Sequence, residues 1–178
     1  MGGNVYLVGM MGAGKTTLGK ALAQRTAREF VDTDRLIVER TGVPVATIFE
    51  FEGEEGFRRR ESAVIAEVSQ RSGCVVATGG GAVLMEENRH AMRSSGTVVY
   101  LRARLERLWE RTRHDTARPL LATADPRGTL AALLEKREPL YREAAHVVVE
   151  TGAQGASTLV SRVLAALGEH EESSRHGR

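Results

Sequence analysis

Short apolar runs alternate along the chain with longer stretches in which apolar residues recur at helical spacing. The runs that we predict as strands are Asn4–Val8, Glu29–Val31, Cys74–Ala77, Thr97–Leu101 and His146–Glu150. The stretches that we predict as helices are Lys15–Ala27, Glu54–Arg71, Glu86–Ser94, Ala103–Arg113, Gly128–Glu143 and Ser157–Leu167. Because short apolar strands separated by helices are typical of a parallel sheet covered on both faces, the pattern predicts an α/β domain.

Two stretches do not fit simple crossover helices. Arg35–Arg71 is too long for one connection between neighbouring strands, and Thr112–Arg127 contains two prolines and few periodic apolar residues. In an α/β domain, insertions of this kind usually lie at the carboxyl ends of strands, where ligands bind. We expect one domain over residues 1–168, followed by a disordered polar tail over residues 169–178.

Composition narrows the class of protein. The 178 residues are 42% hydrophobic and 27% charged, which indicates a single globular domain and excludes wholesale disorder. No apolar run approaches the roughly 20 residues that span a bilayer, and no signal peptide is evident. Cys74 is the one cysteine, so an intramolecular disulfide and a cysteine zinc cluster are excluded. We expect a cytoplasmic monomer without a membrane partner, and the net charge of +2, mixed in sign, argues little for nucleic acid.

A phosphate-binding loop is the clearest motif. Gly9–Thr16 matches G-x-x-x-x-G-K-[ST] in full, directly after a predicted strand and at the start of a predicted helix. Its glycines let backbone N–H groups approach phosphate oxygens, and the helix N-terminus adds a positive dipole end. We expect Lys15 to span the β- and γ-phosphates and Thr16 to hold Mg²⁺. The alternative, a glycine-rich turn that binds nothing, is disfavoured by the complete motif in its proper context. The predicted nucleotide contacts in this loop are Gly12, Ala13, Gly14, Lys15, Thr16 and Thr17.

Acidic residues for such a site come from the second strand. The third strand ends without an acid, and no Asn-Lys-x-Asp motif for guanine is present. Asp32 and Asp34 follow Glu29–Val31, and residues two apart in extended chain point the same way. One carboxylate can serve Mg²⁺ while the other accepts a proton from a hydroxyl. The competing interpretation is that Asp34 caps a helix that begins near Arg35.

Arginines and glycines supply candidates for an anionic acceptor. Phe57, Glu61, Val64 and Val68 fall on one helical stripe, so Glu61 is an acid on an apolar face, three residues from Arg58. This pair is either a surface salt bridge or a device that orients Arg58 toward an anion.

Further candidates lie in connecting segments. Gly79, Gly80 and Gly81 after a strand suggest close approach of backbone to a ligand, although a flexible turn is the alternative. Arg118, held before Pro119 in a loop, has the character of a lid residue that stabilises charge, unless it is a solvated arginine. Arg137 precedes an expected helix interruption at Pro139 and can face the same site.

Taken in order and spacing, these motifs resemble the shikimate kinase family over about residues 4–165. The resemblance implies a P-loop kinase of the nucleoside-monophosphate-kinase type, with a five-stranded parallel sheet in the order 2-3-1-4-5 flanked by helices. It implies a substrate-binding insertion at about 33–61, a lid at about 112–127, and phosphoryl transfer from ATP to the 3-hydroxyl of shikimate in aromatic amino acid biosynthesis.

Site residues follow from the same resemblance. It places around shikimate Asp34, Arg58, Glu61, Gly79, Gly80, Gly81 and Arg137. It places Arg111 and Gln154 beside adenine, and Thr16 and Asp32 at Mg²⁺. It places Arg118 on the lid, where it reaches both the nucleotide phosphate and the substrate, and it assigns catalysis to Lys15, Asp34 and Arg118. The alternatives are another small-molecule kinase such as a gluconate kinase, a nucleoside monophosphate kinase, and a regulator that binds nucleotide without catalysis.

Overall fold

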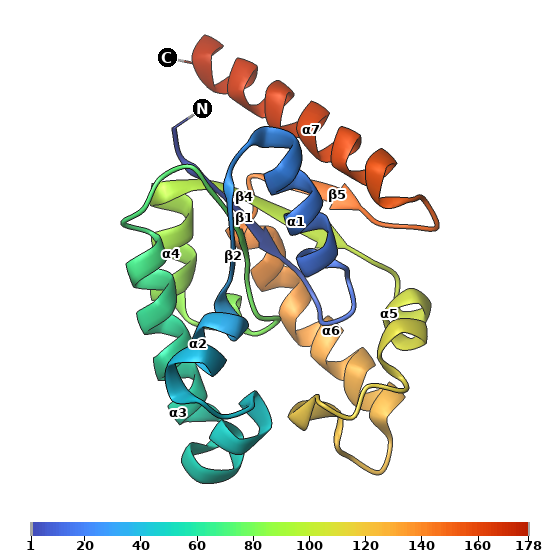
Figure 1. Cartoon of the computed structure of the whole chain (residues 1–178). Coiled ribbons are helices and arrows are strands. Elements are labelled where there is room, and N and C mark those ends of the chain that lie inside the picture. Colours follow the sequence, from blue (N-terminus) through green and yellow to red (C-terminus); the bar gives the residue numbers. More distant parts are fainter. Residues whose placement is uncertain (1, 178) are drawn as a thin grey trace.

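The computed structural model describes residues 2–177 and contains one parallel sheet. Its strands are β1 (Asn4–Val8), β2 (Glu29–Asp32), β3 (Cys74–Ala77), β4 (Gly96–Arg102) and β5 (Val147–Glu150). The strand order is β2-β3-β1-β4-β5, which confirms the predicted topology (Figure 1). The interior strands β1 and β3 are buried at every residue, as expected for a parallel sheet covered on both faces.

Helices form the two outer layers (Figure 1). Helices α1 (Lys15–Thr26) and α7 (Ala156–His176) contact each other and the sheet from one side. Helices α4 (Glu86–Ser95) and α6 (Pro126–Ala144) contact β4 from the other side, and α3 (Val45–Val68) packs beside α4. The remaining short elements are α2 (Thr33–Thr41), α5 (Leu105–Thr112), η1 (Ala82–Leu84) and η2 (Pro119–Leu121). No helix in residues 2–177 is both long and apolar enough to cross a bilayer.

The first insertion contains more helix than the sequence predicts. Helix α3 begins at Val45 and is broken at Gly53, where φ is +70° and ψ is 179°. A positive φ is accessible to glycine at little cost. The predicted start at Glu54 therefore marks only the second of two helical segments, and the first segment was missed.

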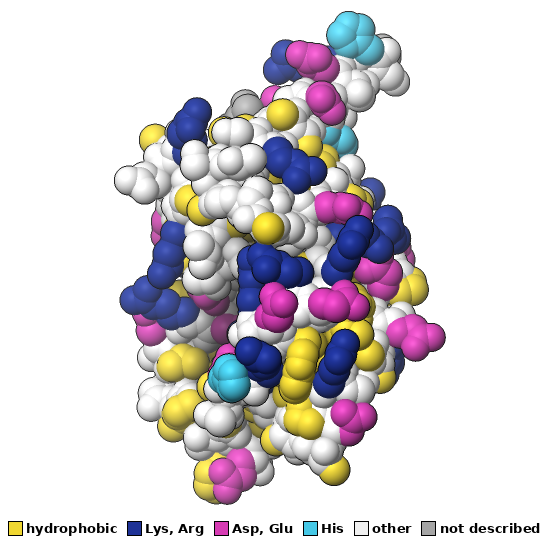
Figure 2. All heavy atoms as spheres, turned by 90° about the vertical axis from the view of Figure 1, so that its right-hand side faces the viewer, with side chains coloured by type: hydrophobic (Ala, Val, Ile, Leu, Met, Phe, Trp, Pro, Cys, Tyr) yellow, Lys and Arg dark blue, Asp and Glu magenta, His cyan; other side chains and the backbone are white. Residues whose placement is uncertain are grey.

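The polar tail is not disordered over its described part. Helix α7 continues through Gly168 to His176, with Val160, Val163 and Leu167 buried beneath its earlier turns. Extension of an anchored helix requires no new nucleus and adds one hydrogen bond for each residue fixed. The prediction of a disordered tail was therefore wrong up to His176, and Arg178 lies outside the described residues. The last turns project beyond the body of the molecule (Figures 1 and 2).

The expected interruption at Pro139 is also absent. Helix α6 runs through Pro139, which has no N–H to donate to the preceding turn. Leu130, Arg137, Tyr141 and Ala144 are buried along the same helix, so packing on both sides of the proline outweighs the lost hydrogen bond.

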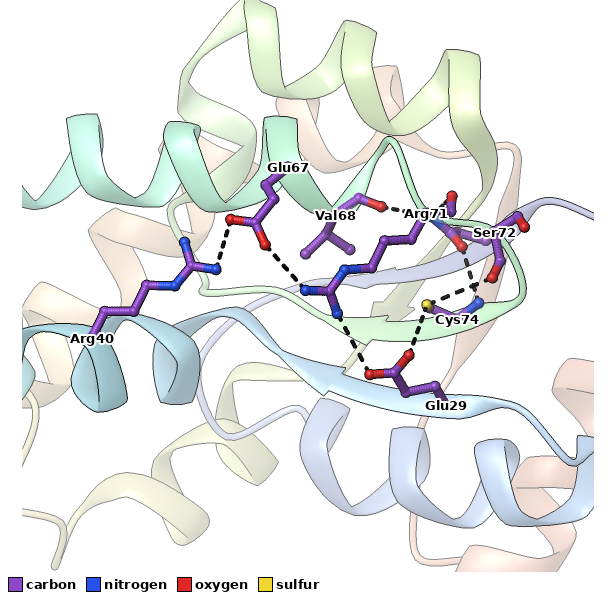
Figure 3. A network of polar contacts seen from close by, with 8 residues as sticks. Glu29, Arg40, Glu67, Val68, Arg71, Ser72 and Cys74 are labelled. Atoms are coloured by element: carbon purple, nitrogen blue, oxygen red, sulfur yellow. Dashed lines mark hydrogen bonds and ion pairs between the residues drawn. The ribbon is translucent and has the colours of Figure 1, made fainter.

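Ion pairs tie the first insertion to the edge of the sheet (Figure 3). Arg40 of α2 pairs with Glu67 of α3 at 2.6 Å, and Glu67 also accepts from Arg71 at 3.1 Å. Arg71 then reaches Glu29 of β2 at 3.5 Å. These groups are partly exposed, so the network orients the elements more than it stabilises them. On the face drawn in Figure 2, cationic and anionic side chains are interspersed and do not gather by sign.

Candidate active site

Two neighbouring cavities with a shared set of lining residues lie at the carboxyl ends of the strands. The larger chamber, about 680 Å³, is lined by the phosphate loop, Asp32, Arg111 and Gln154. The smaller chamber, about 130 Å³, is lined by Phe57, Arg58, Glu61 and Arg137. The residues that line both chambers are Met11, Asp34, Gly79, Gly80 and Arg118. The phosphate loop and the acceptor candidates therefore meet at a shared wall that carries one acid and one arginine.

The phosphate loop has a backbone that favours glycine. Gly12 and Gly14 have φ values of +80° and +94°, and a Cβ on Gly9 would lie 2.6 Å from the Leu101 carbonyl oxygen. The Lys15 Nζ donates to the carbonyl oxygens of Gly9 and Met10, at 2.6 and 2.8 Å. Burial lowers the pKa of Lys15 to about 7. Phosphate oxygens beside this amine would favour its charged form.

Asp32, not Asp34, is the cap of α2. Its Oδ1 accepts from the backbone N–H groups of Asp34 and Arg35, at 3.1 and 3.2 Å. Its Oδ2 accepts from the Thr16 hydroxyl at 3.0 Å. The interpretation of Asp34 as a helix cap is therefore wrong, because α2 begins two residues before Arg35, at Thr33.

Thr16 and Asp32 bring together the oxygen donors that Mg²⁺ prefers. Within residues 2–177, no three His, Cys, Asp or Glu side chains cluster as metal ligands. Mg²⁺ usually takes one or two protein oxygens and completes its coordination with phosphates and water. The hydroxyl and the carboxylate next to the phosphate loop fit that mode of binding.

The carboxyl groups of the buried Glu61 and the partly buried Asp34 both lie beside Gly79. Glu61 is fully buried; its Oε1 accepts from Arg58 at 2.9 Å, and its Oε2 has no hydrogen-bond partner among the residues that the structure describes. Asp34 Oδ1 is likewise buried without a partner. A Cβ on Gly79 would lie 2.6 Å from Glu61 Oε2 and 2.9 Å from Asp34 Oδ1, so this position accepts only glycine without rearrangement.

The environment of these acids changes their titration. Burial raises the pKa of Glu61 to about 7, against the opposing effect of Arg58. Burial also raises the pKa of Asp34, and the neighbouring Asp32 adds to the effect, while Lys15 and Arg118 oppose it. Perturbed acids in a cleft are typical of functional sites.

Two buried arginines line the smaller chamber. Arg58 pairs with Glu61 and with the half-exposed Glu54 at 3.2 Å. Arg137 is only 2% exposed, and no carboxylate within residues 2–177 forms an ion pair with it. A buried cation without a counterion is unfavourable, so the chamber is prepared for an anion. A Cβ on Gly81 would overlap the Arg58 guanidinium, which explains the glycine there.

The remaining predicted residues border the larger chamber. Arg111 donates to the Gly12 carbonyl at 3.1 Å, and the Gln154 amide donates to the Glu150 carbonyl at 3.3 Å. Arg118 stands in the second insertion, is partly exposed, and pairs with Asp115 at 2.9 Å. Ala13, Gly14 and Thr17 line the same chamber.

Some apolar residues that line the smaller chamber are not among the site residues that the sequence predicts. Val45, Phe49, Pro119 and Leu120 border the smaller chamber, and Phe49 packs on Phe57 with ring centroids 5.0 Å apart. Val45 and Phe49 lie on the helical segment that was missed. Pro119 and Leu120 adjoin Arg118 in the sequence, and that adjacency was the available signal.

Three features define the class of protein: the strand order, the phosphate loop, and an acid beside a chamber that is lined by buried arginines. Together they are those of a P-loop kinase that acts on a small molecule. Residues 11–168 match the shikimate kinase family, and the chain belongs to it. A shikimate kinase of Bordetella avium is 56% identical over 168 residues, which are 94% of this chain and 80% of that protein. One of Chromobacterium violaceum is 54% identical, over 92% of this chain and 89% of that protein.

Comparison with solved structures supports the same family. Shikimate kinase from Acinetobacter baumannii in complex with shikimate has a TM-score of 0.92 and 46% identity, covering 94% of this chain and 93% of that one. A gluconokinase from Sinorhizobium meliloti has a TM-score of 0.61 at 20% identity, covering 98% and 97%, and shares only the fold. This chain is therefore a phosphotransferase that uses ATP and acts on an alcohol group of shikimate.

The titration of Glu61 predicts how stability depends on pH. Its folded pKa, about 7, exceeds its ordinary value of 4.5, so the fold favours the neutral acid. The contribution is complete below pH 4.5 and is lost as pH rises toward 7, by at most on the order of 3 kcal/mol. Glu61→Gln keeps an acceptor for Arg58 and cannot ionise, so its stability relative to wild type should rise over this pH range.

Urea unfolding at several pH values between 4.5 and 8, without ligands, measures this difference. Glu54→Gln is the matched control, because it removes the exposed partner of the same arginine. Parallel pH profiles for wild type and Glu61→Gln would contradict the assignment.

Proposed function

We propose that the larger chamber binds ATP with Mg²⁺, that the smaller chamber binds shikimate, and that the phosphoryl group passes between them beside Asp34. The observation that carries this proposal is the wall shared by the two chambers, where Asp34 and Arg118 line both cavities. An acceptor hydroxyl and a γ-phosphate can meet only at such a junction.

The nucleotide half is assigned to the phosphate loop and its neighbours. Backbone N–H groups of residues 12–17 would hold the phosphates, and Lys15 would neutralise the transferring group. Thr16 and Asp32 would hold Mg²⁺, which supplies charge neutralisation to the β- and γ-phosphates when bound. Arg111 and Gln154 border the chamber where adenine would lie.

The substrate half is assigned to the buried arginines. Shikimate carries one carboxylate, and Arg58 and Arg137 present the planar guanidinium groups that bind carboxylates well. Glu61 fixes Arg58 from behind. The backbone of Gly79–Gly81 would contact the hydroxyl groups, while Phe49, Phe57 and Leu120 would cover the ring.

Asp34 is the proposed proton acceptor. As the 3-hydroxyl oxygen of shikimate bonds to the γ-phosphorus and the bond to the ADP oxygen breaks, the hydroxyl proton would move to the Asp34 carboxylate. Lys15 and Arg118 would stabilise the charge that develops on the transferring group. Positioning and charge neutralisation carry most of the work in this reaction.

We also propose that the protein acts as a monomer, because every group that is assigned to the site belongs to one chain. We propose a cytoplasmic location, because the reaction consumes ATP.

The test of the substrate assignment is Arg58→Ala, with Arg59→Ala as its control. Truncation of a buried charge partner corresponds to about 2–5 kcal/mol, so kcat/KM for shikimate should fall roughly 30- to several-thousand-fold. Arg59 is the next residue, is exposed, and within residues 2–177 forms an ion pair only with the exposed Glu55, at 3.0 Å, so its removal should change little. ATP binding should persist in both variants.

The measurement is ADP release with shikimate, with its carboxamide analogue, and with gluconate. Wild type should have a much higher kcat/KM for shikimate than for the amide. In Arg58→Ala this ratio of the two kcat/KM values should be smaller. If wild type phosphorylates the amide as well as the acid, the carboxylate clamp is wrong. Turnover with gluconate and not with shikimate would replace the proposed substrate.

A further inference from the structure

Tyr141 contacts the glycine loop but has no part in the mechanism above. It lies on α6, one turn after Arg137, and is fully buried. Its hydroxyl donates to the Gly80 carbonyl oxygen at 2.5 Å and lies 3.4 Å from the Met10 sulfur in the phosphate loop. One hydroxyl therefore connects α6, the glycine loop and the phosphate loop.

The glycine loop is surrounded by the groups that were assigned to substrate. A Cβ on Gly80 would lie 3.3 Å from an Arg137 nitrogen and 3.3 Å from the Met11 backbone nitrogen. Gly79 abuts Asp34 and Glu61, and Gly81 abuts Arg58. Because glycine restrains its own backbone poorly, the position of this loop depends on bonds from outside it.

A second tyrosine stacks on the ring of Tyr141, and its hydroxyl bonds to a carboxylate outside the glycine loop. Tyr100 of β4 stacks on Tyr141, with ring centroids 5.0 Å apart and planes inclined by 22°. Its hydroxyl donates to Glu138, a carboxylate that Arg102 and Arg142 also contact. The two rings are thus matched in type and neighbourhood, but only one hydroxyl reaches the glycine loop.

We propose that Tyr141 is a positioning residue: through its hydrogen bond to the Gly80 carbonyl it fixes the glycine loop against the phosphate loop, and so sets the affinity for shikimate. This inference rests on the proposed substrate site. A loop that is already ordered loses little conformational entropy when substrate binds. The hydrogen bond from Tyr141 therefore favours shikimate binding without contacting shikimate. Burial raises the pKa of Tyr141 to about 12, so the hydroxyl keeps its proton over the working pH range.

The experiment compares Tyr141→Phe with Tyr100→Phe. Each variant removes one oxygen and leaves the stacked ring in place. Loss of the only donor seen at the Gly80 carbonyl among the described residues should raise KM for shikimate at least about fivefold in Tyr141→Phe. KM for ATP should stay within about twofold of wild type, and Tyr100→Phe should leave both constants within that range.

Amide hydrogen exchange measures directly how well the glycine loop is ordered, even in a variant with weak activity. The Ala82 and Leu84 amides donate to the Gly79 and Gly81 carbonyls, at 3.1 Å each, and should exchange faster in Tyr141→Phe than in Tyr100→Phe. Thermal unfolding of both variants shows whether the whole fold has weakened.

Unchanged KM for shikimate with unchanged exchange would overturn the proposal. So would an equal rise of KM in both variants, because packing of the rings would then explain it. Failure of wild type to release ADP in response to shikimate would refute the proposed function instead, and the exchange comparison would still decide whether Tyr141 fixes the loop.

Discussion

Lys15→Met is expected to lower kcat by at least about 10²- to 10³-fold while the protein stays folded. The Lys15 ammonium already lies against the phosphate loop, where it donates to the carbonyl oxygens of Gly9 and Met10. A γ-phosphoryl group in the larger chamber would take over those donors. Methionine fills a similar volume without charge, so the variant removes the stabilisation of developing negative charge, together with the two hydrogen bonds to the carbonyl oxygens of the loop.

Lys20→Met is the matched control for this prediction. Lys20 lies on the same helix and is exposed, so the same change of side chain there should leave kcat within about twofold of wild type. Single-turnover kinetics with circular dichroism for both variants separate chemistry from folding. Wild-type kcat in a folded Lys15→Met protein would remove the nucleotide site from the larger chamber.

The sequence predicts the sheet well because its strands carry their own signal. β1 and β3 match their predicted bounds at both ends, since each is a short apolar run that turn residues terminate. The phosphate loop is local too: its glycines, Lys15 and Thr16 are adjacent in sequence, and the flanking strand and helix fix their geometry. For such features, neighbours in sequence are neighbours in space.

Features that depend on tertiary packing were predicted poorly. The helix through Pro139 persists because Arg137 and Tyr141 are buried on either side of it, which no local propensity reveals. The segment from Val45 to Phe49 borders the smaller chamber and is followed by the break at Gly53, whose positive φ cannot be read from a pattern of apolar residues.

The roles of the two acids show the same limit at the scale of single atoms. The sequence predicts that Asp32 and Asp34 both face the site, with the competing interpretation that Asp34 caps a helix that begins near Arg35. Helix α2 begins at Thr33, so Asp32 is its cap and Asp32 Oδ1 accepts hydrogen bonds from the backbone N–H groups. The Asp34 carboxylate does not cap the helix and lines the two chambers. A shift of two residues in a helix boundary therefore separates the acid that caps the helix from the acid that faces the chambers.

Asp34→Asn is expected to lower kcat by at least about 10²-fold with little change in stability. The substitution preserves shape but replaces the carboxylate that would accept the proton of the 3-hydroxyl. Because the cap of α2 is Asp32, the helix start should survive, and the melting temperature should stay close to that of wild type. Asp125→Asn is the charge-matched control: Asp125 caps α6 through Gly128 at 3.0 Å, away from both chambers, and its amide should leave kcat unchanged.

The division between kcat and KM decides what Asp34 does. A proton acceptor acts as the phosphoryl group moves, so Asp34→Asn should lower kcat and kcat/KM together while ATP binding, measured without shikimate, stays intact. If the variant instead raised KM for shikimate and kept kcat, Asp34 would bind a hydroxyl of the substrate without taking its proton. In that case the buried acid opposite it, Glu61 with its unpartnered Oε2 beside Gly79, would become the next candidate for the proton acceptor.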